Sequence, residues 1–249
     1  MRTVQFLFAF TLYVTGINWA IAAPVGLTED SATGDLDIRA SSPPAPGSSN
    51  NNPIKGTMNV NGNNALPFDA DCYAILCLEK KPLFQRNSFE SADNRKDAGV
   101  RKTFPGGKGT GPFRNPTQAG VNVPPGGNFV SPEEFPFAST MQGGDQAYLF
   151  PVTEASQRSQ GGTINDFYRR YKIESAHKNP NANSWYQITG WSGQLGPYCQ
   201  ALQNNGGNSN RNDPICKQGG NGKGSWGFDV GEYVYYYDGQ SYHKPQGSK

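Results

Sequence analysis

The segment from Ser131 to Tyr171 most constrains what this chain can fold into. It opens with SPEEFPFASTMQGG at 131–144, where two adjacent carboxylates, Glu133 and Glu134, precede a Phe-Pro-Phe sequence and a Gly-Gly pair. A second Gly-Gly pair lies in SQGGTINDFYRRY at 159–171 and introduces a run with a basic end. An acidic pair, a sharp turn, an amide-rich loop and a basic helix are the parts that metal-assisted cleavage of a phosphodiester requires.

The local pattern of this segment predicts an α+β fold. Strands are expected at Glu134–Thr140 and Ala147–Val152, and the intervening Gly143-Gly144 indicates a hairpin turn. The apolar residues of TINDFYRRYK recur at helical spacing, which predicts a helix over Thr163–Lys172. Strand, turn, strand and helix follow in the order of a ββα-metal finger. The side chains expected to be buried between them are Phe137, Ile164 and Phe167.

The flanking sequence predicts additional antiparallel strands and long loops. Residues 103–130 are rich in glycine and proline and predict a long loop. Aromatic and β-branched residues predict strands at Trp185–Trp191 and 227–239. A short apolar element, helix or strand, is expected at 71–82, and a short helix with a basic face at Asn87–Lys102.

The acidic pair is the candidate for the chemistry. Adjacent side chains on a strand point to opposite faces, so only one of the two is expected to face the site. We assign Glu134 as base and metal ligand, with Glu133 as the alternative, and Gln157 as an amide ligand of Mg²⁺ or Mn²⁺. His177 and His243 lie outside the segment, which disfavours nucleases and hydrolases that use a histidine base.

Phosphate-binding groups are expected around the predicted helix start. Gln160 and the backbone N–H groups of Gly161 and Gly162 would meet an anion at a helix N-terminus, although an ordinary turn is the alternative. We expect Glu134 and Gln157 to project into one solvent-accessible cleft. The arginines expected to hold flanking phosphates there are Arg158, Arg169 and Arg170. A net charge of +2 is too small to indicate nucleic-acid binding by itself.

The chain divides into three stretches. Met1–Ala22 has a basic start, an apolar run and a small-residue cleavage site, which predict a secretory signal peptide. A membrane anchor is the alternative, disfavoured because Asn18 interrupts the apolar run. Residues 23–65 are rich in Ser, Pro, Gly and Asn and predict a disordered linker or pro-segment. Residues 66–249 are expected to form the domain, which we take to be secreted, free of membrane once the signal is removed, and monomeric.

Four cysteines in a secreted chain predict two disulfides, with three pairings open. Proximity along the chain favours Cys72–Cys77 together with Cys199–Cys216. The second bridge would close a glycine- and asparagine-rich loop and restrict the unfolded chain. A zinc site is disfavoured because the cysteines lack ligand spacing.

The central segment resembles the NucA/NucB family of secreted deoxyribonucleases, in the form expected of fungal members. The resemblance is carried by EEFPFAST, the following Gly-Gly, SQGG and the Phe-Tyr pair of the predicted helix. It implies a ββα-metal nuclease in which a carboxylate replaces the usual histidine. Glu134 falls on the last acid of the family motif, Glu133 on the third position, and Gln157 on a metal-binding Asn. Met141-Gln142 stands where bacterial members have an acidic pair.

These features predict a secreted, metal-dependent endonuclease that hydrolyses DNA without base specificity, with RNA as an open alternative substrate. The rival interpretation is a binding protein or effector that keeps the nuclease scaffold without its activity. In that case Met141 or another apolar group would fill the metal position. A carbohydrate-binding surface is a third interpretation, based only on the many Tyr and Trp residues.

Overall fold

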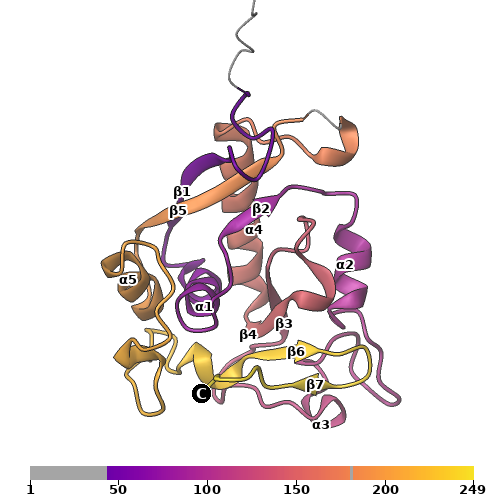
Figure 1. The fold of residues 1–249 in the computed structure, drawn as a ribbon. Helices are drawn as coiled ribbons and strands as arrows, with labels where there is room; N and C mark the ends of the chain where they lie inside the picture. The colour runs from indigo at the N-terminus through magenta and orange to yellow at the C-terminus, as the bar shows by residue number, and fades with distance from the viewer. Residues whose placement is uncertain (1–43, 180–181) are drawn as a thin grey trace, which may run out of the picture. The chain divides into compact units, whose positions relative to one another are not determined.

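The structure is a computed structural model that describes residues 44–179 and 182–249 (Figure 1). The predicted signal peptide at 1–22 and the linker up to residue 43 lie outside the described residues. Within the described ranges, no helix is both long and apolar enough to span a bilayer. The described elements confirm the α+β class, with two separate sheets and two disulfides.

The first sheet has three strands in the order β1-β5-β2. Strand β1 (Ile54–Val60) runs parallel to the central β5 (Trp185–Gly193), and β2 (Leu83–Gln85) is antiparallel to β5. The strand expected at Trp185–Trp191 is thus confirmed. Strand β1 shows that the linker prediction for 23–65 is wrong at its C-terminal end, because Met58 and Val60 alternate inward into the core.

The second sheet is antiparallel and has the order β3-β4-β6-β7. Its strands are β3 (Ser131–Phe135), β4 (Tyr148–Val152), β6 (Tyr235–Tyr237) and β7 (Tyr242–His243). The pairing of β3 with β4 confirms the predicted hairpin, although the first strand begins and ends earlier than expected. The long strand expected at 227–239 is wrong. Only three residues of it form a strand, after a 3₁₀ turn at Val230–Tyr233.

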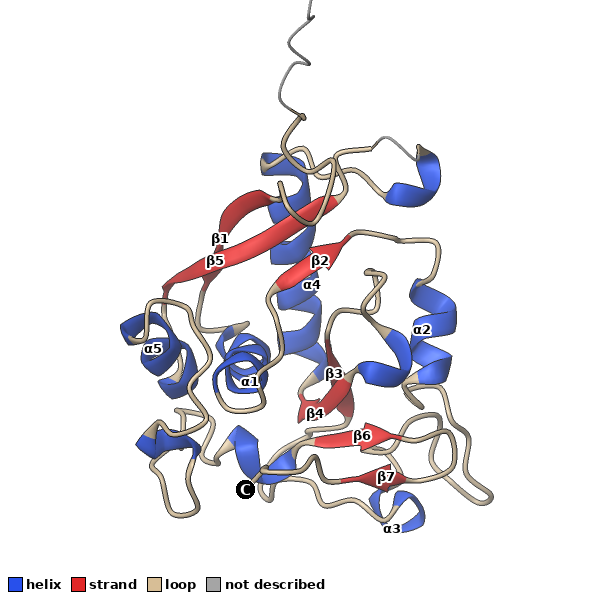
Figure 2. Cartoon of the chain, in the orientation of Figure 1, coloured by secondary structure: helices blue, strands red, loops and turns tan. Residues whose placement is uncertain are grey.

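Helix α4 (Glu154–Arg170) follows β4 directly and completes the ββα order (Figure 2). It contacts β1 of one sheet and β3 of the other. Gly56 permits the first contact, because a Cβ there would lie 2.6 Å from the Phe167 ring. Ile164, Phe167 and Phe137 are all buried, as predicted. The remaining helices are α1 (Ala65–Leu76), α2 (Ser91–Asp97), α3 (Pro116–Ala119) and α5 (Pro197–Asn204).

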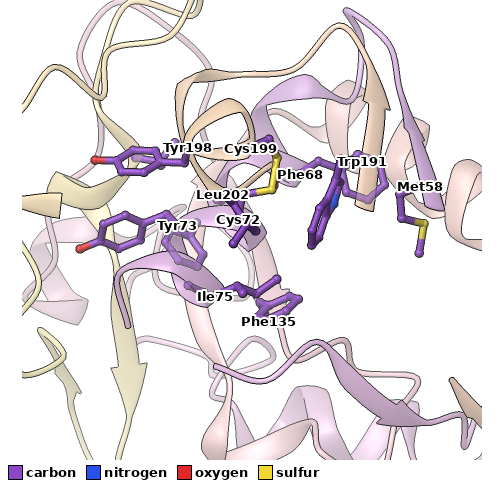
Figure 3. Close-up of a cluster of buried hydrophobic side chains, with 14 of the residues drawn as sticks. Met58, Phe68, Cys72, Tyr73, Ile75, Phe135, Trp191, Tyr198, Cys199 and Leu202 are labelled. Carbon is purple, nitrogen blue, oxygen red and sulfur yellow. A yellow bond between two sulfur atoms is a disulfide. The ribbon is translucent and has the colours of Figure 1, made fainter. Parts of the chain in front are cut away.

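Helix α1 is the centre of the core, since every one of its residues is buried. It packs against α4, α5 and the β3–β4 pair. The apolar element expected at 71–82 is therefore a helix that begins earlier. Figure 3 shows its Tyr73 beside Tyr198 of α5, where the two rings meet edge to face at 4.9 Å. Asp69 also joins these helices, because its carboxylate accepts the backbone N–H of Cys199 at 3.0 Å.

The predicted disulfide pairing is wrong. The bridges are Cys72–Cys199 and Cys77–Cys216, with Cα atoms 4.9 and 5.4 Å apart. Cys72 lies within α1 and Cys77 caps its end, and five residues of helix rise about 7.5 Å. A disulfide does not span Cα atoms more than about 7 Å apart, so the helix itself separates the two neighbours. Both bridges instead tie α1 to the C-terminal part of the chain. Figure 3 shows the first of them, between Cys72 and Cys199.

Candidate active site

A cleft of about 510 Å³ opens where β3, α4 and the loops before α3 meet. It is lined by β3, by α4 from Gln157 to Tyr168, and by residues of α2 and the loop that follows it. The polar and charged side chains that line it include Arg86, Arg95, Arg101, Arg114, Glu133, Glu134, Gln157 and Gln160. The expectation that Glu134 and Gln157 share one cleft agrees with this arrangement.

Both glutamates of β3 line the cleft although they are neighbours on a strand. Glu134 lies toward α2, where its Oε1 is 3.5 Å from the Nε of Arg95. Its Oε2 is buried and accepts no hydrogen bond from any described residue. Glu133 lies toward α4 and interacts with Gln160. Only 3% of Glu133 and 6% of Glu134 is exposed, so neither is the solvent-facing acid that the sequence suggested.

The burial of these acids shifts their proton affinities. Burial raises the pKa of Glu134 to about 7, and the positive charges of Arg95 and Arg101 limit that rise. Burial also raises the pKa of Glu133 well above its usual value. The charge of Glu134 adds to that rise and the amide of Gln160 opposes it. A carboxylate that titrates near neutral pH is suited to take a proton from water.

Asp71 is a third acid of this site, and sequence reasoning missed it. It lies on α1, is only 1% exposed, and its Oδ2 accepts a hydrogen bond from Nε2 of Gln160 at 2.9 Å. Its Oδ1 is buried and has no hydrogen-bond donor within the described ranges. Burial, and then the charge of Glu133, raise the pKa of Asp71 well above its usual value. The available signal was a pair of acids, Asp69 and Asp71, inside an apolar helical run.

Gln160 therefore stands between Asp71 and Glu133 and is not arranged to receive a phosphate. Gln157 is also held by the protein. Its Oε1 accepts the hydroxyl of Ser131, and its Nε2 donates to the carbonyl of Pro132. These bonds fasten α4 to the start of β3 and leave the Gln157 amide less free to act as the metal ligand that we expected.

The predicted anion site at Gly161-Gly162 is wrong. Helix α4 begins at Glu154, and its N-cap is Thr153, whose hydroxyl accepts the backbone N–H of Ser156 at 3.1 Å. Only the first four N–H groups of a helix lack partners within it, so the glycine N–H groups lie too far into α4 to bind an anion. The glycine pair is a mid-helix feature, and it misplaced the predicted helix start by nine residues.

The predicted phosphate-binding arginines also lie elsewhere. Arg158 pairs with Glu154, and Arg169 pairs with Asp166 on the exposed side of α4. Neither these two nor Arg170 is among the described residues that line the cleft. The lining arginines come from outside α4, at positions 86, 95, 101 and 114. Two of them, Arg95 and Arg101, belong to a basic stretch between α2 and the following loop.

The carboxylate oxygens of this site suit a hard cation that takes few ligands from the protein. The buried oxygens Oε2 of Glu134 and Oδ1 of Asp71 have no donor among the described side chains and backbone groups. A buried carboxylate oxygen without a partner is unfavourable, and a cation would relieve it. No set of three His, Cys, Asp or Glu side chains is placed to hold a metal in the described ranges. Mg²⁺ is usually bound by one or two carboxylates and keeps several waters, which fits such a site.

A buried acidic group in an arginine-lined cleft, on a disulfide-linked α+β scaffold, has the composition of a nuclease site. The family model of Deoxyribonuclease NucA/NucB matches residues 71–179. This segment of the chain is therefore similar to the NucA/NucB family, and the similarity supports a nuclease that hydrolyses DNA. The match runs from α1 to the turn after α4 and includes all the lining residues named above. No curated protein and no solved structure matches the chain.

Proposed function

We propose that this protein is a secreted, divalent-metal-dependent endonuclease that hydrolyses DNA phosphodiester bonds without base specificity in the cleft of β3 and α4. The observation that carries the proposal is the burial of Glu133 and Glu134 beside one another in a cleft lined by four arginines. Carboxylates suit a base and a cation, and arginines suit the phosphates on either side.

In this proposal Glu134 takes the proton of the attacking water and offers its free Oε2 to Mg²⁺ or Mn²⁺. When bound, the metal supplies positive charge to the developing oxyanion and helps ionise the water. Arg95 lies 3.5 Å from Glu134 and is 44% exposed, so its guanidinium can also contact a substrate phosphate in the cleft. Glu133, Gln160 and Asp71 form a buried chain that fixes the second acid.

The absence of base specificity follows from the kind of contacts that the cleft offers. Guanidinium groups bind the phosphodiester backbone, which has the same structure in every sequence. Secretion is supported by the paired state of all four cysteines, because such bridges persist in oxidising compartments.

A plasmid-nicking assay tests the proposal on the oxidised full chain with Mg²⁺, Mn²⁺ or EDTA. We expect nicking with metal and none with EDTA. Glu134→Gln should lower the rate by about a hundredfold or more, as expected for loss of a general base. Glu174→Gln, which changes an exposed glutamate outside the cleft, is the matched control and should leave the rate unchanged. Cleavage by Glu134→Gln at the wild-type rate would transfer the role to Glu133.

The second candidate is a binding protein that keeps this scaffold without cleavage. It is favoured by the amide of Gln157, which is hydrogen-bonded within the protein at both its oxygen and its nitrogen. Its expected apolar plug is not Met141, because that side chain is 52% exposed and is not part of the cleft lining. Salt-dependent binding of DNA that stays intact with every metal would support this candidate.

A further inference from the structure

Phe89 is an exposed aromatic ring that the proposed chemistry does not use. It is 71% exposed, the most of any large apolar side chain in the described ranges. Met141, at 52%, is the other such side chain there. A ring that remains in water gives up the free energy of burial, about 1.5–3 kcal/mol for a phenylalanine. The ring is therefore accessible to a binding partner.

Hydrogen bonds of the neighbouring residues and a contact with the His177 ring hold Phe89 in place. The backbone N–H of Ser88 donates to Oγ of Ser175 at 2.9 Å, and that hydroxyl lies 2.7 Å from Nδ1 of His177. The His177 ring packs against Phe89 at 5.8 Å between centroids, with the two planes tilted by 33°. On the other side, the N–H of Phe89 donates to Oδ1 of Asn87 at 3.2 Å. One face of Phe89 is thus supported while the residue as a whole remains open to solvent.

Phe89 does not line the cleft itself but directly follows residues that do. Ser88, its neighbour in the chain, lines the cleft, and so does Arg86 two residues earlier. Helix α2 begins two residues after Phe89 and carries Arg95, which contacts Glu134. A strand whose phosphates follow these arginines past the acids would bring one of its bases beside the ring.

We propose that Phe89 is a stacking platform for an unpaired nucleobase next to the cleaved phosphodiester. This inference rests on the proposed function, since it assumes that a DNA strand occupies the cleft. Stacking on an aromatic ring tolerates any base, because every base has a π-face. The platform therefore favours single-stranded or locally opened DNA without adding base specificity. The bases of an intact duplex are already stacked and offer the ring no free face.

Binding without cleavage tests the platform. The full chain with Glu134→Gln, kept in EDTA, is titrated into a labelled oligothymidylate and followed by fluorescence anisotropy. The second change is Phe89→Leu, which keeps an apolar side chain but removes the ring, or Phe89→Trp, which keeps a ring. We expect Phe89→Leu to weaken binding about fivefold or more, the usual effect of losing one base stack. Phe89→Trp should restore it, and the salt dependence should not change.

Oligothymidylates with one abasic site, moved along the strand, separate stacking from general adhesion. At one position along the strand, the abasic site should weaken binding to the protein that retains Phe89. The same oligonucleotide should bind the Phe89→Leu protein as tightly as the intact strand does. Equal affinities of the Leu and Phe proteins for every oligonucleotide would overturn the proposal, as would an absence of single-strand binding. One outcome is that the abasic site weakens binding only when Phe89 is present, while the wild-type protein never nicks DNA. That result would support the stacking platform and contradict the proposed nuclease activity. Equal melting temperatures of the variants would show that the fold is intact.

Discussion

Because Glu134 is buried, its protonation affects the stability of the fold as well as the proposed catalysis. The folded protein holds this proton up to a pKa of about 7, whereas an unfolded glutamate releases it near 4.5. Between these values the folded state binds more protons than the unfolded state. The metal-free protein therefore loses stability as pH rises through this window, by up to about 1.4 kcal/mol per pH unit from this group alone.

Glu134→Gln removes that titration, so we expect its melting temperature to rise relative to wild type between pH 5 and pH 8 in EDTA. Calorimetry at several pH values measures the difference. Arg95 and Arg101 also act on this group and are present in both proteins. Loss of the Glu134 charge lessens the rise in the pKa of Glu133, which changes the pH dependence of stability in the same direction. Glu174→Gln changes an exposed glutamate and serves as the control. The difference between its melting temperature and that of the wild type should stay constant with pH. A constant difference for Glu134→Gln would show that the acid is not protonated in the fold.

The arginines of the cleft should differ from those of α4 in DNA binding. Arg101→Ala should weaken DNA binding, and should lower the slope of log affinity against log salt by about 0.9 if one phosphate contact is lost. Arg169→Ala is the matched control, since Arg169 pairs with Asp166 outside the cleft, and it should change neither quantity. Filter binding over a salt series in EDTA distinguishes the two. A larger effect of Arg169→Ala would place the DNA along α4 instead.

At the scale of the element, α4 carries two glycines that it does not need for packing. A Cβ added at Gly162 would meet no described atom within 4 Å, and the residue is exposed. Gly162→Ala should therefore stabilise the protein by roughly 0.5–1 kcal/mol, the usual gain inside a helix. Denaturant unfolding measures this.

Gly196→Ala is the contrasting change at the start of α5. Its Cβ would lie 2.5 Å from the carboxyl carbon of the buried Asp69 and 2.7 Å from the ring of the partly buried Trp226. It should destabilise the protein. A gain in stability from Gly196→Ala would mean that α1 and α5 separate more easily than their packing indicates.

Helix α4 also shows what sequence reasoning could and could not find. The spacing of Ile164 and Phe167 predicted its buried face correctly, because one helical face determines that pattern. The Gly-Gly pair obscured the start, although Thr153 is a favourable N-cap in the sequence. The acidic pair was predicted from the motif alone. Asp71 was not, because its role depends on α1 packing against α4, and no local pattern encodes that contact.

Contacts between distant parts of the chain account for the other errors. The disulfide pairing was wrong because proximity in sequence was taken for proximity in space. Strand β1 was missed because its partner β5 follows more than 120 residues later, as the pairing of Ile54 with Tyr186 shows. A short strand in a polar stretch has little local signal of its own, and its stability comes from the sheet.

At the scale of the whole molecule, the segment matched by the family model lacks elements that its fold needs. Residues 71–179 include Cys72 and Cys77 but neither of their partners, and they lack both β1 and β5. We expect an isolated 71–179 fragment to be unfolded by circular dichroism. A fragment of 66–249 should fold less stably than one beginning at residue 44, because it lacks β1. Equal melting temperatures for the two longer fragments would show that β1 is dispensable.

Reduction of the disulfides should also destabilise the folded protein. The bridges join residues 127 and 139 positions apart, and losing a native disulfide commonly costs about 2–5 kcal/mol. Dithiothreitol should therefore lower the melting temperature strongly and abolish nicking at 37 °C. Cys77→Ser with Cys216→Ser tests one bridge at a time. Full activity in reductant would show that packing alone holds α1 in place.

The attachment of α1 by two bridges has a consequence for the cell that makes the protein. Asp71 and the packing beneath Glu133 depend on this helix, and the helix depends on oxidised cysteines. We expect chains in a reducing cytosol to lack an assembled cleft and, if the protein is secreted as proposed, to gain it only in an oxidising compartment. A producer of such a nuclease would need no separate inhibitor to spare its own genome. Expression in cytosols of reducing and oxidising strains, with genomic damage as the readout, measures that protection.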